Sequence, residues 1–219
     1  MRLYHFLRAS DALDDLQRQR LKISRLHEMN DPFELLAADL RDKSMRRAFQ
    51  ETRAELMKKF GVLCFSRGWR NPVMWSHYAD RHRGICLAFD VPSDKFSPML
   101  YDAKRLPDVL PKVLSGTAQA QEQMMLRLLT TKFEDWKYED EVRVFSDLET
   151  ADPATGFYFS DFGRDLTLRE VILGPRFEGR LSDAADQCRG RYPGIKIFNA
   201  RLSFRTYSIV ERRGSAVVV

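Results

Sequence analysis

Apolar positions along the chain follow two spacings, which predict different elements. Short apolar runs and period-two alternation predict strands at residues 3–7, 21–24, 61–66, 84–90, 156–162 and 166–173. Helical spacing predicts helices after residues 10–11 and at residues 42–60, 71–80, 107–132 and 181–192. Residues 196–210 are expected to form one long strand or a hairpin, and a Ser-Gly pair at residues 115–116 is expected to interrupt the fourth helix. That helix, which is rich in Leu and Met, would pack its apolar side chains in the core, among them Leu110, Val113 and Leu114.

Two of the predicted strands, residues 61–66 and 84–90, are apolar along their length, which is typical of central strands buried on both faces. The helix between them predicts that the two strands are adjacent. Trp75 and Tyr78 lie three residues apart on this helix, so they point the same way. They either pack in the core or form the floor of a planar pocket.

Residues 30–34, Asn-Asp-Pro-Phe-Glu, have the composition of a helix start. Asp31 suits the N-cap, Pro32 the first helical position and Glu34 the capping box. On this interpretation Phe33 anchors the turn in the core. Ser10 and Asp11 are a similar N-cap signal for the first helix.

Composition and charge set the wider limits. With 219 residues, 44% of them hydrophobic, and no Gly/Ser/Pro-rich linker, residues 1–213 are expected to form a single domain followed by a tail at 214–219. The formal net charge of +5 favours anionic partners mildly. Three scattered cysteines indicate free thiols in a reducing compartment. The start of the sequence resembles neither a signal peptide nor a membrane span, so we expect a cytoplasmic protein with no membrane partner.

The acidic stretch at residues 136–145 is the strongest candidate for chemistry. Read as a strand, it places Glu139, Glu141 and Arg143 on one face, where the two like charges repel. Either this face is solvated and carries an ion-pair ladder, or the carboxylates point into a cleft, with one Glu oriented by Arg143 and the other free to meet a ligand. No metal is expected, because His77 and His82 are five residues apart and do not share a helical face.

Several of these stretches resemble the bacterial domain-of-unknown-function family 2971. The matching stretches are residues 3–6 (LYHF), 21–24 (LKIS), 30–34 (NDPFE), 63–66 (LCFS), 74–80 (MWSHYAD), 84–86 (GIC) and 136–143 (WKYEDEVR). The order of these motifs also resembles, more distantly, the ADP-ribosyltransferase plan. That resemblance implies an α+β fold in which a split, mostly antiparallel central sheet, flanked by helices, grips NAD in a cleft.

The second resemblance also implies roles for single residues. Glu141 would bind the nicotinamide ribose and stabilise the positive charge that develops as the glycosidic bond breaks, and Glu139 would orient or deprotonate the acceptor. His5 would bind the adenosine-side ribose, and the backbone of Phe6 would meet the nicotinamide amide. Tyr78, with Trp75, would stack on the nicotinamide ring, and Ser66 or Ser76 would donate to its carboxamide. The residues expected to bind NAD are His5, Phe6, Ser66, Trp75, Ser76, Tyr78 and Arg143.

Three functions follow as hypotheses. The first is an NAD-dependent ADP-ribosyltransferase-like enzyme in a phage-defence or toxin system, with a nucleic-acid or protein acceptor and a neutralising partner protein. Arginines near the cleft would suit its phosphates, namely Arg67, Arg70, Arg81 and Arg83. The second is a non-catalytic nucleic-acid- or protein-binding module on the same fold. The third is a metal-dependent nuclease that uses Asp31, Glu139 and Glu141.

Overall fold

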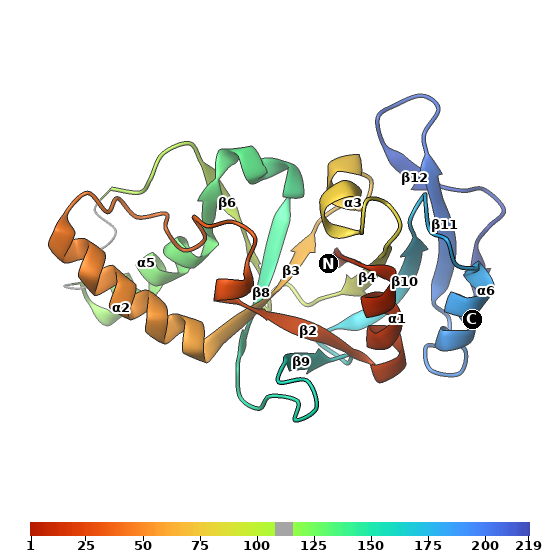
Figure 1. Cartoon of the computed structure of the whole chain (residues 1–219), viewed down its shortest axis with the longest axis horizontal. Coiled ribbons are helices and arrows are strands. Elements are labelled where there is room, and N and C mark those ends of the chain that lie inside the picture. Colours follow the sequence, from red (N-terminus) through yellow and green to blue (C-terminus); the bar gives the residue numbers. More distant parts are fainter. Residues whose placement is uncertain (108–115) are drawn as a thin grey trace.

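The computed structural model describes residues 1–107 and 116–219 of the chain. Its main feature is a large mixed sheet, mostly antiparallel, with helices packed around it (Figure 1). The predicted α+β class is therefore confirmed. Among the described residues, no helix combines the length and the apolar character needed to cross a bilayer.

The elements follow one another in mixed order along the chain. The main sheet contains β1 (Arg2–Leu7), β2 (Arg20–Arg25), β3 (Phe60–Ser66), β4 (Ile85–Asp90), β5 (Ser97–Pro98), β8 (Glu141–Asp147), β9 (Tyr158–Asp161), β10 (Thr167–Leu173), β11 (Lys196–Leu202), β12 (Ile209–Glu211) and β13 (Val217–Val218). A small parallel pair consists of β6 (Leu100–Asp102) and β7 (Thr131–Phe133). The helices within the described residues are α1 (Ala9–Arg18), α2 (Lys43–Lys59), α3 (Pro72–Tyr78), α5 (Ala118–Thr130) and α6 (Leu181–Cys188), with the 3₁₀ turns η1 (Leu26–Glu28) and η2 (Glu134–Glu139).

The sheet is narrowly joined at its centre. β1 pairs with β4 along its whole length, and β3 pairs with β8 in the same way. Between β1 and β3, the register within the described part of the chain is Tyr4 opposite Ser66. Beyond this pair the two strands have different partners, so the sheet can open between them.

The expected adjacency of β3 and β4 is wrong, because β1 lies between them in the order β4-β1-β3. Both strands run antiparallel to β1, so they are parallel to each other. The connection through α3 therefore passes over one strand. Apolar composition predicted that both strands are central and buried, but it carries no information on which strand separates them.

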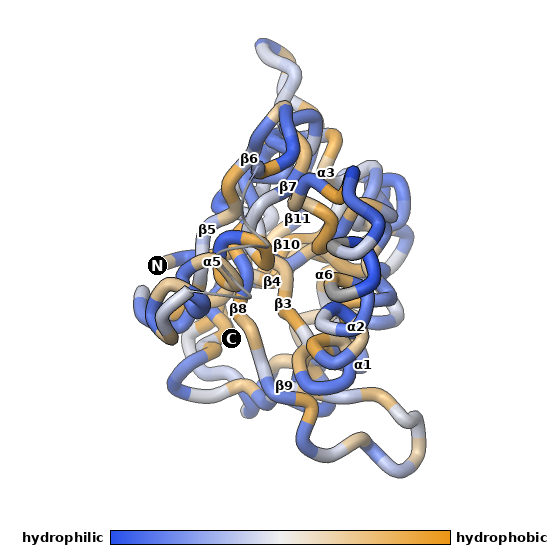
Figure 2. Tube along the Cα trace, turned by 90° about the vertical axis from the view of Figure 1, so that its left-hand side faces the viewer, coloured by the Kyte–Doolittle hydropathy of each residue, from blue (hydrophilic) through white to orange (hydrophobic). Residues whose placement is uncertain are grey.

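The core lies on both faces of the sheet. In β4, Leu87 and Phe89 pack on the face that carries α1 and α6, whereas Cys86 packs with Trp75 of α3 on the other face. This alternation follows from the period-two geometry of a strand. Figure 2 shows hydrophobic positions concentrated along the central strands β3, β4 and β10.

Two predicted helix starts are wrong. The helix α1 begins at Ala9 with Arg8 at its N-cap, rather than after residues 10–11. Residues 32–35 form a turn rather than a helix. Asp31 does accept a hydrogen bond from the Phe33 amide, at 2.9 Å, but the Phe33 side chain is 59% exposed instead of anchored in the core.

Predictions towards the C-terminus are largely confirmed. The helix α6 forms but ends at Cys188, short of the predicted residue 192. Residues 196–210 form the β11–β12 hairpin, one of the two expected arrangements, and the tail contributes the short strand β13 beside β11. The predicted helix at 107–132 is seen as α5 from Ala118 to Thr130. Several positions of the predicted helix lie outside the described residues. They are the expected core positions Leu110, Val113 and Leu114, and Ser115, the first residue of the expected interruption.

Candidate functional site

A pocket of about 290 Å³ opens where β1 and β3 diverge. Six of the residues predicted from the sequence line this one pocket: His5, Phe6, Ser66, Tyr78, Glu139 and Glu141. They come from β1, β3, α3, η2 and β8, which are far apart in the sequence. The structure therefore brings together the histidine, the tyrosine and the acidic pair that the motifs singled out.

The helix α3 is fixed at its start by Asn71. The side-chain oxygen of Asn71 accepts a hydrogen bond from the Val73 amide at 2.9 Å, and its amide nitrogen donates to the Tyr138 carbonyl, also at 2.9 Å. The first bond caps the helix, and the second ties it to η2. As a result Tyr78, in the last turn of α3, lies against Glu139, the last residue of η2.

The acidic stretch is not one strand, contrary to the prediction. Glu139 ends the 3₁₀ turn η2, Asp140 adopts a left-handed conformation with φ of 44°, and β8 begins only at Glu141. The turn at Asp140 is held by Arg67, whose guanidinium lies 2.9 Å from its carboxylate. The two glutamates thus come from different elements, and a turn rather than strand alternation brings them to one place.

Five side chains form a buried charge cluster: Glu34, Lys132, Glu139, Glu141 and Arg143. Lys132 Nζ lies 2.6 Å from Glu139 Oε2 and 3.4 Å from Glu141 Oε2. Arg143 Nε lies 2.8 Å from Glu141 Oε1, and its Nη1 lies 2.5 Å from Glu34 Oε1. All five residues are between 0% and 6% exposed, so the alternative of a solvated strand face does not hold.

The two pocket carboxylates have opposite pKa shifts. Burial opposes the ionisation of Glu141, but Arg143 and Lys132 outweigh it and hold the pKa of Glu141 below its ordinary value. Burial also acts on Glu139, and there the partial compensation by Lys132 and Tyr78 leaves the pKa raised. Glu141 is therefore the carboxylate that stays charged at neutral pH, and Glu139 is the one closer to holding a proton.

Tyr78 and His5 both have defined protonation states. Burial and the hydrogen bond to Glu139 raise the pKa of Tyr78, so its hydroxyl remains a donor to that glutamate while it accepts from Asn30 at 2.9 Å. Burial lowers the pKa of His5, partly opposed by a 2.7 Å contact between its Nδ1 and the Cys64 carbonyl. Because a carbonyl only accepts, Nδ1 carries the proton and Nε2 of the neutral ring is an acceptor.

Three predicted NAD-binding residues do not line the pocket. Trp75 is fully buried, packs edge-on against Phe6 and donates its indole N–H to the Trp69 carbonyl, so it belongs to the core. Ser76 lies on the exposed side of α3. Arg143 is fully buried, and its guanidinium contacts the pocket residue Glu141. Helical spacing alone could not separate the buried face of α3 from the face that meets the pocket.

Ser66 lines the pocket, but its hydroxyl already donates to the Gly68 carbonyl at 3.0 Å. The arginines expected around the cleft are also elsewhere, because none of Arg67, Arg70, Arg81 and Arg83 is among the described pocket residues. Among the described residues that line it, the cationic side chain is that of Lys132. Lys132 and Glu34 were not predicted as site residues, because their sequence contexts are those of an ordinary helix end and a capping box.

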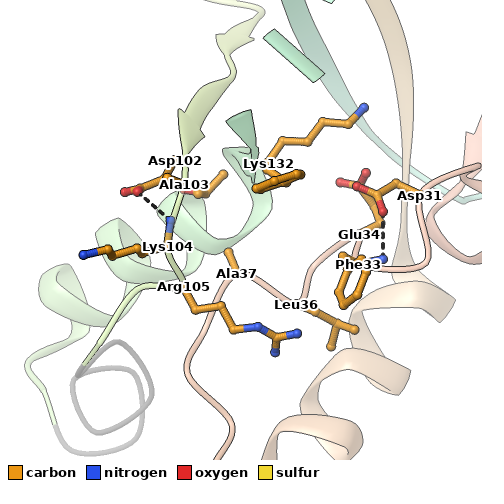
Figure 3. Close-up of a pocket in the computed structure, with 12 residues that line it drawn as sticks. Asp31, Phe33, Glu34, Leu36, Ala37, Asp102, Ala103, Lys104, Arg105 and Lys132 are labelled. Atoms are coloured by element: carbon orange, nitrogen blue, oxygen red, sulfur yellow. Dashed lines mark hydrogen bonds between the residues drawn. The ribbon is translucent and has the colours of Figure 1, made fainter. Parts of the chain in front are cut away.

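A second pocket, of about 270 Å³, shares Lys132 with the first. Figure 3 shows the carboxylates of Asp31 and Glu34 on one side of it and Asp102 on the other. Glu34 Oε2 is buried there and has no hydrogen-bond partner among the described residues. Of the three carboxylates of the nuclease hypothesis, Asp31 lines this second pocket, whereas Glu139 and Glu141 line the first. Within residues 1–107 and 116–219, no group of three or more His, Cys, Asp or Glu side chains is arranged to hold a metal ion.

The comparisons with known proteins bear on this region of the chain. Residues 74–144 match the model of a family described as "Protein of unknown function (DUF2971)". The predicted resemblance to DUF2971 is thereby confirmed over this stretch, which runs from α3 into β8. The DUF2971 match contains Tyr78, Lys132 and both pocket glutamates, and the family description names no activity. No curated protein and no solved structure matches the chain.

Proposed function

We propose that the pocket between β1 and β3 binds the nicotinamide ribose half of NAD, and that the protein is an ADP-ribosyltransferase-like enzyme. The observation that carries the proposal is Glu141, a buried and charged carboxylate that lines the same pocket as His5 and Tyr78. At about 290 Å³ the pocket is at the lower end of small-molecule sites. It would therefore enclose only part of a dinucleotide.

The pocket residues suit this ligand chemically. NAD supplies a ribose on which positive charge develops as its bond to nicotinamide breaks. A carboxylate held in place by Arg143 is preorganised to stabilise such charge without moving at the moment of reaction. The Nε2 of His5, which is the acceptor nitrogen of the neutral ring, can accept a hydrogen bond from a ribose hydroxyl, and the ring of Tyr78 offers an aromatic surface to a flat nicotinamide.

Glu139 suits a different task. Its raised pKa and its contact with Lys132 favour proton exchange, which is what activation of an acceptor hydroxyl or amine requires. We assign it to the acceptor side of the reaction. A place in a phage-defence or toxin system, with a neutralising partner protein, belongs to the same proposal.

The test is NAD turnover by the purified protein, followed as free nicotinamide with and without DNA, RNA and cell lysate. The variant Glu141→Gln is expected to lower nicotinamide release by about 100-fold or more, because it removes the charge that stabilises the transition state. Glu122→Gln is the matched control, since it makes the same change on the exposed side of α5. Glu139→Gln should reduce transfer to an acceptor more than nicotinamide release.

Unchanged nicotinamide release by Glu141→Gln, with circular dichroism showing an intact fold, would show that Glu141 takes no part in the reaction.

The non-catalytic module is the second candidate, and one observation favours it. Glu139 and Glu141 already bond to Lys132 and Arg143, so the cluster can be read as structural. If neither NAD binding nor nicotinamide release is detected, that reading replaces the enzyme.

A further inference from the structure

The β11–β12 hairpin ends in a loop that projects beyond the rest of the molecule, at the top right of Figure 1. Two aromatic side chains at this tip are open to solvent, Phe204 at 92% and Tyr207 at 101% exposure, and Leu202 beside them is 58% exposed. Single exposed apolar residues are common on protein surfaces, but a cluster on a protruding tip indicates a contact surface.

The loop is held in a defined shape. The Ser203 hydroxyl accepts hydrogen bonds from the amides of Arg205 and Thr206, at 3.2 and 3.3 Å. The Ser203 amide donates to the Ser208 carbonyl at 2.9 Å. At the base, the Ile209 amide donates to the Arg70 carbonyl at 2.8 Å. The aromatic rings are therefore presented on a fixed loop, which lowers the entropy cost of binding.

The charge at the tip of the hairpin is of one sign, because Glu211 of β12 lies further down the hairpin, where it pairs with Lys196. Arg201 and Arg205 lie on either side of Phe204, and residues 197–210 contain no Asp or Glu. The Arg201 guanidinium carbon lies 4.8 Å from the centre of the Phe204 ring. Cationic and aromatic groups are thus combined at the tip, without a carboxylate that would repel a polyanion.

We infer that this hairpin docks single-stranded nucleic acid. Phe204 and Tyr207 would stack on unpaired bases, and Arg201 and Arg205 would contact the phosphates between them. Exposed aromatic rings interleaved with arginines are the groups that single strands bind, because every base offers a flat face and every link a negative charge. The inference concerns binding alone and stands whether or not the pocket cleaves NAD.

The test is fluorescence anisotropy of the full chain with labelled single-stranded DNA and RNA of mixed sequence. The double variant Phe204→Ala/Tyr207→Ala is expected to weaken binding at least tenfold, since it removes both rings on which unpaired bases would stack. Arg201→Ala/Arg205→Ala should weaken binding and make it less dependent on salt. Phe157→Ala, at a partly exposed ring outside the hairpin, is the matched control and should bind like the wild type.

Three results would overturn the inference. They are no binding of single strands at low salt, equal binding by the wild type and the double aromatic variant, and tighter binding of the matching duplex than of the single strand.

Light scattering tests whether the tip instead binds a second copy of the chain. A concentration-dependent dimer that the aromatic variant abolishes, without nucleic-acid binding, would assign the tip to self-association. Both aromatic substitutions are at exposed positions, so we expect them to leave the fold unchanged, and a melting curve checks this.

Discussion

β4 and β8 are strands of one sheet and both are buried, yet they are buried in different ways. In β4 the positions from Ile85 to Phe89 carry small or apolar side chains and are fully buried. In β8 the first three residues, Glu141, Val142 and Arg143, are equally inaccessible, but two of them are charged. The two strands lie on opposite sides of the pair β1 and β3, so they show two kinds of core in one fold.

The energetic consequences differ in sign. Each large apolar side chain buried in β4 stabilises the fold by about 1.5–3 kcal/mol. Each ion buried beside β8 costs several kcal/mol in lost hydration, which only a well-placed partner offsets. An apolar set at these positions would be at least as stable, so stability alone does not account for the charges. Stability therefore gives no reason for the charges at the start of β8, whereas the chemistry proposed for the pocket does.

The largest expected effect comes from breaking the cluster at its most buried member. Arg143→Met leaves Glu34 and Glu141 without their shared cation and should lower the free energy of unfolding by roughly 3–5 kcal/mol. Urea unfolding followed by circular dichroism measures it. A second variant that adds Glu34→Gln and Glu141→Gln should recover part of the loss. A wild-type midpoint for Arg143→Met would show that the cluster is not held together by this arginine.

A cavity in the apolar strand should have a somewhat smaller effect. Leu87→Ala removes a fully buried side chain from the core beneath α1 and should cost about 3 kcal/mol, through lost burial and the space left behind. This loss does not involve a titrating group, so it should be the same at pH 5 and pH 7.5. The contrast between the two strands would be contradicted if the unfolding free energy lost in Leu87→Ala changed with pH as strongly as that lost in Arg143→Met.

The same contrast explains how much the sequence predicts. Apolar runs are short-range signals, and from them the positions of β1, β3, β4 and β10 follow closely. The order β4-β1-β3 does not follow, because strand pairing depends on contacts between segments far apart in the chain. The partners of charged side chains were predicted least well. Glu34, for example, has the spacing of a capping box, but it pairs with Arg143, over one hundred positions away.

The pocket shows the same limits. Its acidic pair was visible in the sequence because two glutamates two residues apart are unusual in a strand. The turn at Asp140 was not visible, since its left-handed conformation depends on tertiary contacts such as that with Arg67. Trp75 was misplaced for a similar reason, because the three-residue spacing it shares with Tyr78 does not tell which of the two faces the core.

The smallest expected effect concerns Asp15, a buried acid of α1, the helix that packs on β4. Burial, aided by its acidic neighbours, raises the pKa of Asp15 to about 7 from an ordinary 3.8. An acid whose pKa is raised on folding keeps its proton in the folded state and loses it on unfolding. Its effect on stability therefore becomes more unfavourable as the pH rises from about 4 to about 7, the opposite direction to that of Glu141.

Asp15→Asn removes this dependence. Relative to the wild type, the variant should gain about 2 kcal/mol of unfolding free energy between pH 5 and pH 7, because the wild type loses that amount over the same range. Urea unfolding of both proteins at the two pH values measures the difference, with Asp94→Asn as a control at an exposed acid. A gap that stays constant or narrows with rising pH would mean that Asp15 is charged in the folded protein. The core between α1 and β4 would then tolerate a buried charge, as the cluster beside β8 does. The contrast between β4 and β8 would lose its physical basis.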